Sequence, residues 1–374
     1  MIWVPINCDD LKLIDKAVTF LQEEFHPAGA SPVWSVEYFQ WKLGISNPAG
    51  AGYVSLAMLD DRVVGIVSLT RKRLLVNGRL VVGGEVGDSY SSARVRRSAH
   101  PNSLSELDTN PTSFVNRSIF GRLASEVRAR AQADGVQAIY GTPNANAYPG
   151  WTKRLGYFDF QGYNNYSYSR PTSCGFIKQY PTLAFCRRLI RFGEYALIKN
   201  HAVLSRKINR HLVFEPLRLD DTEIETLWEC IKPSFGFSLV RDRAYWRHRY
   251  FEHPLAKYSI YGVRCKGRLV AICAVRLSTI SGGKTVLHIV EWMAEKKVSL
   301  SFLLTQILDV YKSWEIDSYN LWVSAVGEEA DAARQSLFIR RNRVPIIFAD
   351  NVVGREIAAL KNKFFFYLGS VDAV

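Results

Sequence analysis

Residues suited to binding a phosphate group and residues suited to carrying protons lie close together in one stretch of the chain. A helical pattern opens at "VNRSIFGRL" (residues 115–123), and the Gly-, Asn- and Pro-rich turn "GTPNANAYPG" (141–150) follows it. Backbone N–H groups at a helix start, together with the helix dipole, favour a bound phosphate. The strand-like segment "GGEVGD" (83–88), which contains two acids, precedes the helix. This arrangement predicts a site for an anionic ligand.

The composition is that of a globular protein. The chain has 374 residues, 48% hydrophobic and 22% charged, which is enough for two domains of ordinary size. No apolar run reaches the roughly 18 residues that span a bilayer, and no signal-peptide pattern is present. The six cysteines show no metal spacing, so we predict a reduced, cytoplasmic protein without a metal site. Without a Walker-type loop or a GxSxG motif, an NTPase and a serine hydrolase are disfavoured.

Much of the net charge of +13 lies in one segment. Between Phe176 and His211, eight Lys and Arg residues stand against a single acid, Glu194, which leaves +7. Apolar residues are interleaved, and this pattern predicts basic amphipathic helices in a linker at residues 171–211. Such a linker can contact a membrane surface, RNA or another polyanion. Alternatively, it is a solvated connection whose apolar side packs on its neighbours.

Two stretches about 206 residues apart share a pattern. Each has a Tyr followed by another aromatic (Tyr38, Tyr245), then an aromatic-basic pair and an Asn-Pro or His-Pro dipeptide. Each then has two strand-like runs joined by a tight turn. Two copies are too few for a solenoid. The repeat therefore predicts a duplicated domain, with an N-terminal copy at residues 1–170 and a C-terminal copy at residues 212–374.

Periodicity in the first copy predicts helix, antiparallel strands, helix, strand and helix. The first helix covers residues 9–25, and Asn77-Gly78 joins two strands in a hairpin. The central helix runs from about residue 116 to 134, and a strand follows at 136–141. This order predicts an α/β fold (mixed α+β sheet), in which each copy is a mostly antiparallel sheet flanked by helices.

This order and these residues resemble the GNAT superfamily of acyl-CoA-dependent N-acetyltransferases. The resemblance covers residues 1 to about 165 well and residues 212–350 more weakly. In the family, a segment of the form Gln/Arg-x-x-Gly-x-Gly/Ala opens the central helix and holds the coenzyme A pyrophosphate. Residues 115–120 stand at that place, with departures at Val115, Ser118 and Phe120. The sequence 155–157, Leu-Gly-Tyr, matches the family's Leu-Gly-aromatic ending of the last helix.

The resemblance implies acetyl-CoA or another acyl-CoA as co-substrate. The residues that would bind it lie at the helix start and in the following turn: Asn116, Arg117, Ser118, Ile119, Phe120, Gly121, Arg122, Asn144 and Asn146. The two arginines can add charge-assisted contacts to phosphate. Alternatively, the two asparagines only stabilise the turn, through hydrogen bonds between their side chains and the nearby backbone.

The resemblance also implies catalytic roles. The strands at 80–90 and 136–141 would splay apart, so that the pantetheine arm lies between them like an added strand. An amine must lose a proton before it attacks, and the first choice as base is Glu85, followed by Asp88. Residues three positions apart lie on opposite faces of a regular strand. Both acids can therefore serve only if a β-bulge, which nearby glycines would allow, brings them to one face. Capping of a loop is the alternative role for either acid.

Three further expectations concern Tyr148, the loop 91–113 and the second copy of the domain. Tyr148 is the candidate acid for the leaving thiolate, because Thr152 stands at the family's Tyr position. The loop 91–113 is long, and it is either a lid whose basic residues meet a phosphate or a disordered insertion. The second copy has Ala-Glu-Lys-Lys-Val-Ser where a glycine-rich phosphate site would be expected. We therefore expect that copy to be degenerate.

We predict an N-acyltransferase that moves an acetyl or other acyl group from acyl-CoA to a primary amine. The resemblance points to a small-molecule acceptor such as an amino sugar of surface-polysaccharide assembly. An aminoacyl-tRNA-dependent transferase of the peptidoglycan-bridge (Fem) type is the alternative, and the basic linker fits it. A non-catalytic binding protein is the third hypothesis. Salt-sensitive tRNA binding would favour the second hypothesis, and loss of acyl-CoA affinity would favour the third.

Overall fold

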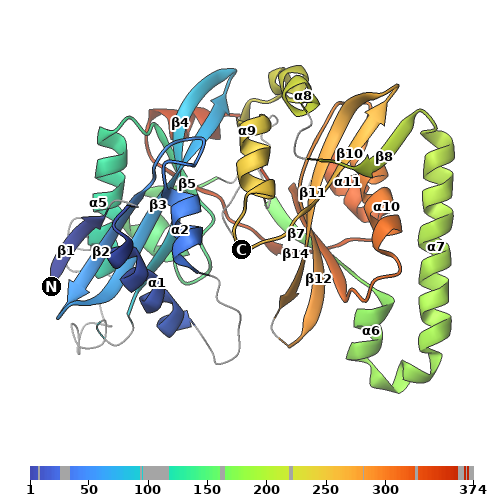
Figure 1. Cartoon of the computed structure of the whole chain (residues 1–374), viewed down its shortest axis with the longest axis horizontal. Coiled ribbons are helices and arrows are strands. Elements are labelled where there is room, and N and C mark those ends of the chain that lie inside the picture. Colours follow the sequence, from blue (N-terminus) through green and yellow to red (C-terminus); the bar gives the residue numbers. More distant parts are fainter. Residues whose placement is uncertain are drawn as a thin grey trace.

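The computed structural model describes residues 1–6, 9–25, 34–92, 95, 118–160, 165–218, 222–280, 282–324, 327–360, 366, 367 and 369. These residues form two mixed sheets that stand side by side, with helices packed against both (Figure 1). The predicted fold class, two tandem α/β units with mostly antiparallel sheets, is confirmed.

The first sheet has the strand order β1-β2-β3-β4-β5-β15-β6, and β9 pairs with β3 beside this path. Its neighbouring strands are antiparallel except β4 and β5, which are parallel. The strands are β1 (Ile2–Ile6), β2 (Tyr53–Leu59), β3 (Arg62–Val76), β4 (Arg79–Ser91), β5 (Ala138–Gly141), β6 (Tyr157–Asp159), β9 (Phe237–Leu239) and β15 (Ile347–Ala349).

The second sheet repeats this plan with the order β14-β7-β13-β12-β11-β10-β8. Here β12 and β13 form the parallel pair. The strands are β7 (Asn165–Pro171), β8 (Leu212–Pro216), β10 (Ser259–Cys265), β11 (Arg268–Ile280), β12 (Lys284–Ala294), β13 (Ser318–Ser324) and β14 (Ile339–Arg343).

The two sheets exchange strands. β15, from the C-terminal part of the chain, lies between β5 and β6, where Phe348 pairs with Tyr140 and Phe158. In return β7, from the N-terminal part, lies between β13 and β14. Each sheet is thus completed by the other part of the chain. The division of the chain at residues 170 and 211 stays a prediction.

The helices cover the faces of the sheets. None of the helices in the described residues is both long enough and apolar enough to cross a membrane. They are α1 (Leu11–Phe25), α2 (Val36–Leu43), α5 (Ile119–Ala133), η1 (Gly150–Arg154), α6 (Ser173–Gln179), η2 (Pro181–Cys186), α7 (Arg187–Ile208), α8 (Glu223–Ile231), η3 (Lys232–Ser234), α9 (Arg243–Trp246), η4 (Arg247–Phe251), α10 (Leu300–Tyr311), α11 (Glu328–Gln335) and α12 (Val352–Ala358).

Local sequence signals explain the turns of three hairpins. Both central residues have positive φ at Asp60-Asp61 (48° and 61°), Asn77-Gly78 (49° and 77°) and Lys266-Gly267 (51° and 82°). Such pairs are typical of the type I′ turns that match the twist of antiparallel strands. All three predicted turns are confirmed. β3 is long: it continues to Val76, and near that end β4 and β9 pair with its two edges.

The repeated segments meet at the centre of the molecule. Trp41 on α2 and His248 on η4 hold equivalent positions in the repeat, and their rings stack with centroids 4.8 Å apart. The Trp41 indole also donates a hydrogen bond of 3.0 Å to the His248 carbonyl. Contact between equivalent positions is the mark of an approximate two-fold relation. The duplication seen in the sequence therefore gives two units that face each other.

Candidate functional site

The parallel strands β4 and β5 separate after a short pairing. They pair from Gly83 with Ala138 to Glu85 with Tyr140. β5 ends at Gly141, whereas β4 continues to Ser91. Six residues of β4 therefore extend beyond the last pair, a length of about 20 Å. The early end of β5 agrees with the predicted splay of these strands and would place Glu85 at its closed end.

A β-bulge lies just beyond Glu85. Ser68 pairs with Gly87 and Ile66 pairs with Tyr90, so that Asp88 and Ser89 lie opposite the single residue between them on β3. Asp88 has a φ of 40°, in the left-handed region. The bulge that the nearby glycines would allow is therefore present.

The bulge brings both acids to one face of the sheet. Glu85 pairs with Thr70, and the Asp88 carboxylate accepts a hydrogen bond from Ser68. Ser68 and Thr70 are two positions apart on a strand, so they share a face.

The first turn of α5 lies at the open end of the splay. A Cβ built on Gly65, which pairs with Ser91 at the end of β4, would come within 2.6 Å of Ile119. The ring of Phe120 packs edge-to-face on Trp151 of η1, with centroids 5.1 Å apart. The turn thus lies between the end of β4 and the segment after β5.

The start of α5 has a side-chain cap and first-turn backbone N–H groups. Ser118 is the N-cap, and its hydroxyl accepts a hydrogen bond of 3.1 Å from the Gly121 N–H. The N–H groups of a first turn have no acceptor inside their helix. Phe120 replaces the family's small residue, but its side chain is directed toward Trp151 and Gly150. This departure is therefore compatible with the predicted phosphate site.

The other predicted binding residues have different surroundings. The Arg122 guanidinium lies over the ring of Trp3, 4.4 Å from its centroid, and its side chain is exposed. Asn144 accepts hydrogen bonds from the N–H groups of Asn146 (3.1 Å) and Ala147 (2.9 Å), which is the geometry of a turn cap. Outside the described residues lie Asn116, Arg117 and all of the loop 91–113 except Ser91, Ser92 and Val95.

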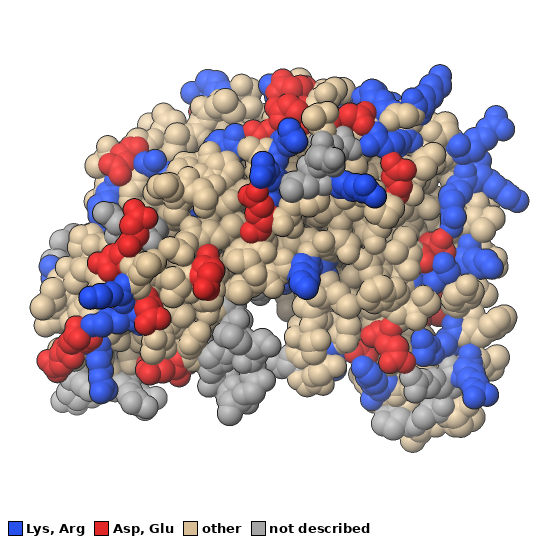
Figure 2. Space-filling model, in the orientation of Figure 1, with Lys and Arg blue, Asp and Glu red and all other residues tan. Residues whose placement is uncertain are grey.

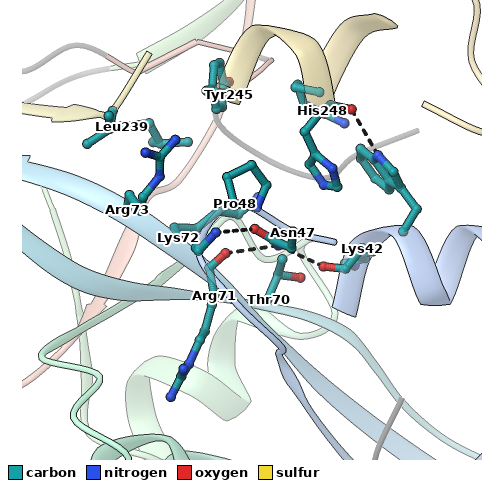
Figure 3. Close-up of a pocket in the computed structure, with 14 residues that line it drawn as sticks. Lys42, Asn47, Pro48, Thr70, Arg71, Lys72, Arg73, Leu239, Tyr245 and His248 are labelled. Carbon is teal, nitrogen blue, oxygen red and sulfur yellow. Dashed lines mark hydrogen bonds between the residues drawn. The ribbon is translucent and has the colours of Figure 1, made fainter. Parts of the chain in front are cut away.

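Glu85 lies against an ammonium group. Its carboxylate is 3.1 Å from the Nζ atom of Lys72, and only 7% of the Glu85 side chain is exposed. Lys72 and Thr70 line a cavity of about 40 Å³ between the first sheet and the α9-η4 segment, and Tyr245 and His248 from the second half form the opposite wall (Figure 3). Sequence reasoning missed Lys72, although the hairpin turn at Asn77-Gly78 fixes its register with Glu85, and it missed Tyr245 and His248 because they are distant along the chain.

Asp88 is fixed by three donors. They are Lys42 Nζ at 2.8 Å, Ser68 Oγ at 2.7 Å and Trp34 Nε1 at 3.2 Å. Burial opposes ionisation of this carboxyl, but the charge of Lys42 and these hydrogen bonds outweigh it and lower the pKa of Asp88. A carboxylate with a lowered pKa and filled acceptor positions is a poor base. The geometry therefore favours Glu85 as base and a role for Asp88 in holding the bulge.

Tyr148 is hydrogen-bonded to a carboxylate other than those of Glu85 and Asp88. Its hydroxyl donates a hydrogen bond of 2.8 Å to Asp159, which also binds Arg343 through two contacts of 2.7 Å. Burial and the neighbouring Asp159 raise the pKa of Tyr148. The hydroxyl is therefore protonated at neutral pH, but its proton is directed at Asp159. Its assignment as a general acid stays a prediction.

The corresponding end of β12 in the second sheet is covered. Tyr367, near the C-terminus, packs on Trp292 of β12 with ring centroids 4.0 Å apart, and its hydroxyl donates to Glu329 at 2.8 Å. The Gly369 carbonyl accepts a hydrogen bond of 3.0 Å from Tyr245. The chain's own C-terminal segment thus fills this region, which favours the predicted degeneration of the second copy.

Glu329 is expected to make stability depend on pH. Burial raises the pKa of its carboxyl from 4.5 to about 7. A raised carboxyl pKa means that the folded state binds the proton more tightly than the unfolded state, so stability falls as pH rises from about 4.5 to 7. We expect Glu329→Gln to raise the free energy of unfolding by about 1–3 kcal/mol at pH 8 and by much less at pH 4.5. Urea unfolding at both pH values measures this, and an equal change at both would contradict it.

Comparison with known proteins gives matches in structure. No protein-family model and no curated protein sequence matches the chain. Similar solved structures include a probable N-acyltransferase of unknown function from Enterococcus faecalis, with 11% identity and a TM-score of 0.56 over 93% of this chain and 72% of that one.

Two further structures match over the same share of the chain. Saccharomyces cerevisiae N-myristoyltransferase with bound myristoyl-CoA is 11% identical, with a TM-score of 0.58 over 93% of this chain and 81% of that one. A GCN5-related N-acetyltransferase from Anabaena variabilis is 11% identical, with a TM-score of 0.55 over 93% and 72%. These likenesses confirm the resemblance at the level of fold: the chain has a tandem GNAT fold.

Proposed function

We propose that the protein transfers an acyl group from acyl-CoA to a primary amine. The observation that carries the proposal is the arrangement around β4. A helix start suited to phosphate lies at the open end of the splay, and a buried carboxylate paired with an ammonium group lies at its closed end. The bound myristoyl-CoA of the yeast N-myristoyltransferase, which has the same fold, supports acyl-CoA as the co-substrate.

Each part of this arrangement has a role in the proposed reaction. The first turn of α5 holds the pyrophosphate of coenzyme A, and the pantetheine arm extends β4 on the side that β5 leaves open. A backbone N–H of β4 near the bulge stabilises the oxyanion that forms when the amine attacks the thioester. Glu85 takes the proton of the amine. An incoming ammonium group has the same charge as Lys72, so it can replace Lys72 beside the carboxylate.

The acceptor in this proposal is a small, hydroxyl-rich amine such as an amino sugar. The cavity beside Lys72 has a mostly apolar lining, to which Asn47, Thr70, Tyr245 and His248 add hydrogen-bonding groups. Hydrogen-bonding side chains of this kind suit a polar acceptor. The five described cysteines form no disulfide, which supports a reducing, cytoplasmic setting.

Calorimetric titration with acetyl-CoA tests the proposal. We expect the full-length protein to bind with a Kd in the micromolar range, and Ser118→Tyr to weaken binding at least tenfold by placing bulk at the helix start. Ser299→Tyr is the matched control, because Ser299 caps α10 in the second half in the same way, through the Phe302 N–H at 3.2 Å. Each variant loses one cap, at a cost of about 1 kcal/mol.

Acetyl-CoA binding by the wild type and the two variants distinguishes the possible locations of the site and the alternative functions. If only Ser299→Tyr weakens binding, the coenzyme site is in the second half and the assignment to α5 is wrong. If the wild-type protein binds no acetyl-CoA, the acyl-CoA proposal fails. Salt-sensitive binding of tRNA would then favour the aminoacyl-tRNA-dependent alternative.

A further inference from the structure

The outward side of α7 is an apolar surface. Leu189, Phe192, Leu197, Leu204 and Ile208, which we call the outer face, are all more than half exposed, and Phe185 in the preceding turn is 85% exposed. On a helical wheel, Leu189, Leu197, Leu204 and Ile208 fall on one side, with Phe192 at its margin. Apolar side chains gathered in this way on a surface mark an interaction site.

The opposite side of α7 accounts for its attachment to the protein. Ile198 and Ala202 are buried and pack toward the core that contains α10. Arg191 pairs with Glu315, and Arg206 pairs with Asp309 beside α10. The helix is therefore fixed on its inner side without using its outer apolar residues. With 22 residues it presents that face over a length of about 33 Å.

Positive charge lies along one flank of the outer face, where Arg188 and Lys199 fall beside Phe192, and at its C-terminal end, where Lys207 falls in line with Leu189. Arg188, Lys199 and Lys207 are exposed on α7, and Figure 2 shows Lys and Arg side chains along the edge of the molecule where α7 lies. The helix contains one acid, Glu194, and its carboxylate is turned inward to accept a hydrogen bond of 2.8 Å from the Ser173 N–H. The outer face is thus mainly apolar, with cationic side chains along one flank and at one end.

We propose that the outer face of α7 inserts into the headgroup region of a membrane that contains anionic phospholipid. A helix in the interfacial plane buries its apolar side and places Lys and Arg among the headgroups, which is the distribution found here. RNA fits less well, because its phosphates would meet aliphatic side chains along the middle of the surface. The binding is independent of acyl transfer.

Vesicle flotation with the full-length protein tests this inference. We expect the protein to float with vesicles of 70% phosphatidylcholine and 30% phosphatidylglycerol at least tenfold more than with pure phosphatidylcholine. Leu189→Ser/Phe192→Ser is expected to reduce the bound fraction at least tenfold. The matched control, Leu80→Ser/Val352→Ser, removes two apolar side chains of similar exposure (75% and 84%) outside this region and is expected to float like the wild type.

Further measurements guard against misfolding and distinguish other partners. Circular dichroism of both double variants shows whether the fold is kept, and Lys199→Glu/Lys207→Glu is expected to abolish the preference for phosphatidylglycerol.

Equal flotation of Leu189→Ser/Phe192→Ser and the wild type would overturn the proposal. Wild-type protein that ignores vesicles but binds tRNA would replace it with an RNA surface. A dimer in light scattering that only Leu189→Ser/Phe192→Ser dissociates, without flotation, would assign the face to a second copy.

Discussion

Glu85→Gln is expected to lower kcat by about 10²- to 10³-fold, with the Kd for acetyl-CoA unchanged within about threefold. The amide has nearly the size of the carboxylate but cannot take the proton of the attacking amine. The measurement is release of the coenzyme A thiol with an acceptor first identified by screening amines, beginning with amino sugars. A general base also gives kcat/KM a rising limb with pH, and this limb should disappear in the variant.

Asp88→Asn provides the contrast for this experiment. Lys42 is 4% exposed and would lose its anionic partner, so the free energy of unfolding should fall by about 3 kcal/mol or more. The rising limb of the pH profile should persist in this variant, because its base is intact. If Asp88→Asn removes the limb and Glu85→Gln keeps it, the two roles are exchanged. If neither variant changes kcat by tenfold, the amine loses its proton elsewhere.

Glu291→Gln is expected to be the most destabilising single change, lowering the free energy of unfolding by about 3–5 kcal/mol. Glu291 and Arg241 are both buried, with side-chain exposures of 0% and 1%, and they form an ion pair. The carboxylate also accepts hydrogen bonds from the hydroxyls of Tyr245 (2.7 Å) and Tyr250. Loss of its charge leaves a buried guanidinium without an anion. Urea unfolding of the full-length protein measures the change.

A double-mutant cycle isolates the pair. Arg241→Met/Glu291→Gln should be destabilised by less than the sum of its single variants, since neither charge then remains buried alone. Asp331→Asn is the exposed comparison, because Asp331 pairs with Arg334 at 58% and 55% exposure, and we expect a change below about 1 kcal/mol. Additive effects of Arg241 and Glu291 would contradict the coupling.

The sequence by itself determined the elements that depend on near neighbours. The central helix, predicted from about residue 116 and capped in the structure by Ser118, was readable from residue types and spacing. So were the hairpin turn at Asn77-Gly78 and the repeat that begins at Tyr38 and Tyr245. Caps and type I′ turns are local structures, because a few consecutive residues contain the groups that form them. The glycines before Asp88 likewise indicated the bulge.

Only the tertiary structure decided how distant segments complete one another. The exchange of β7 and β15 cannot be read from either strand alone, because a short strand fits many edges and its partner is chosen by packing. The contact of Lys72 with Glu85 depends on the register of two strands, and the pair Arg241 and Glu291 joins residues 50 positions apart. Sequence spacing thus located the strand that contains the candidate base. Its charged partner follows from the register of the β3-β4 hairpin, whereas the cavity wall opposite it comes from α9 and η4, whose long-range packing no local pattern encodes.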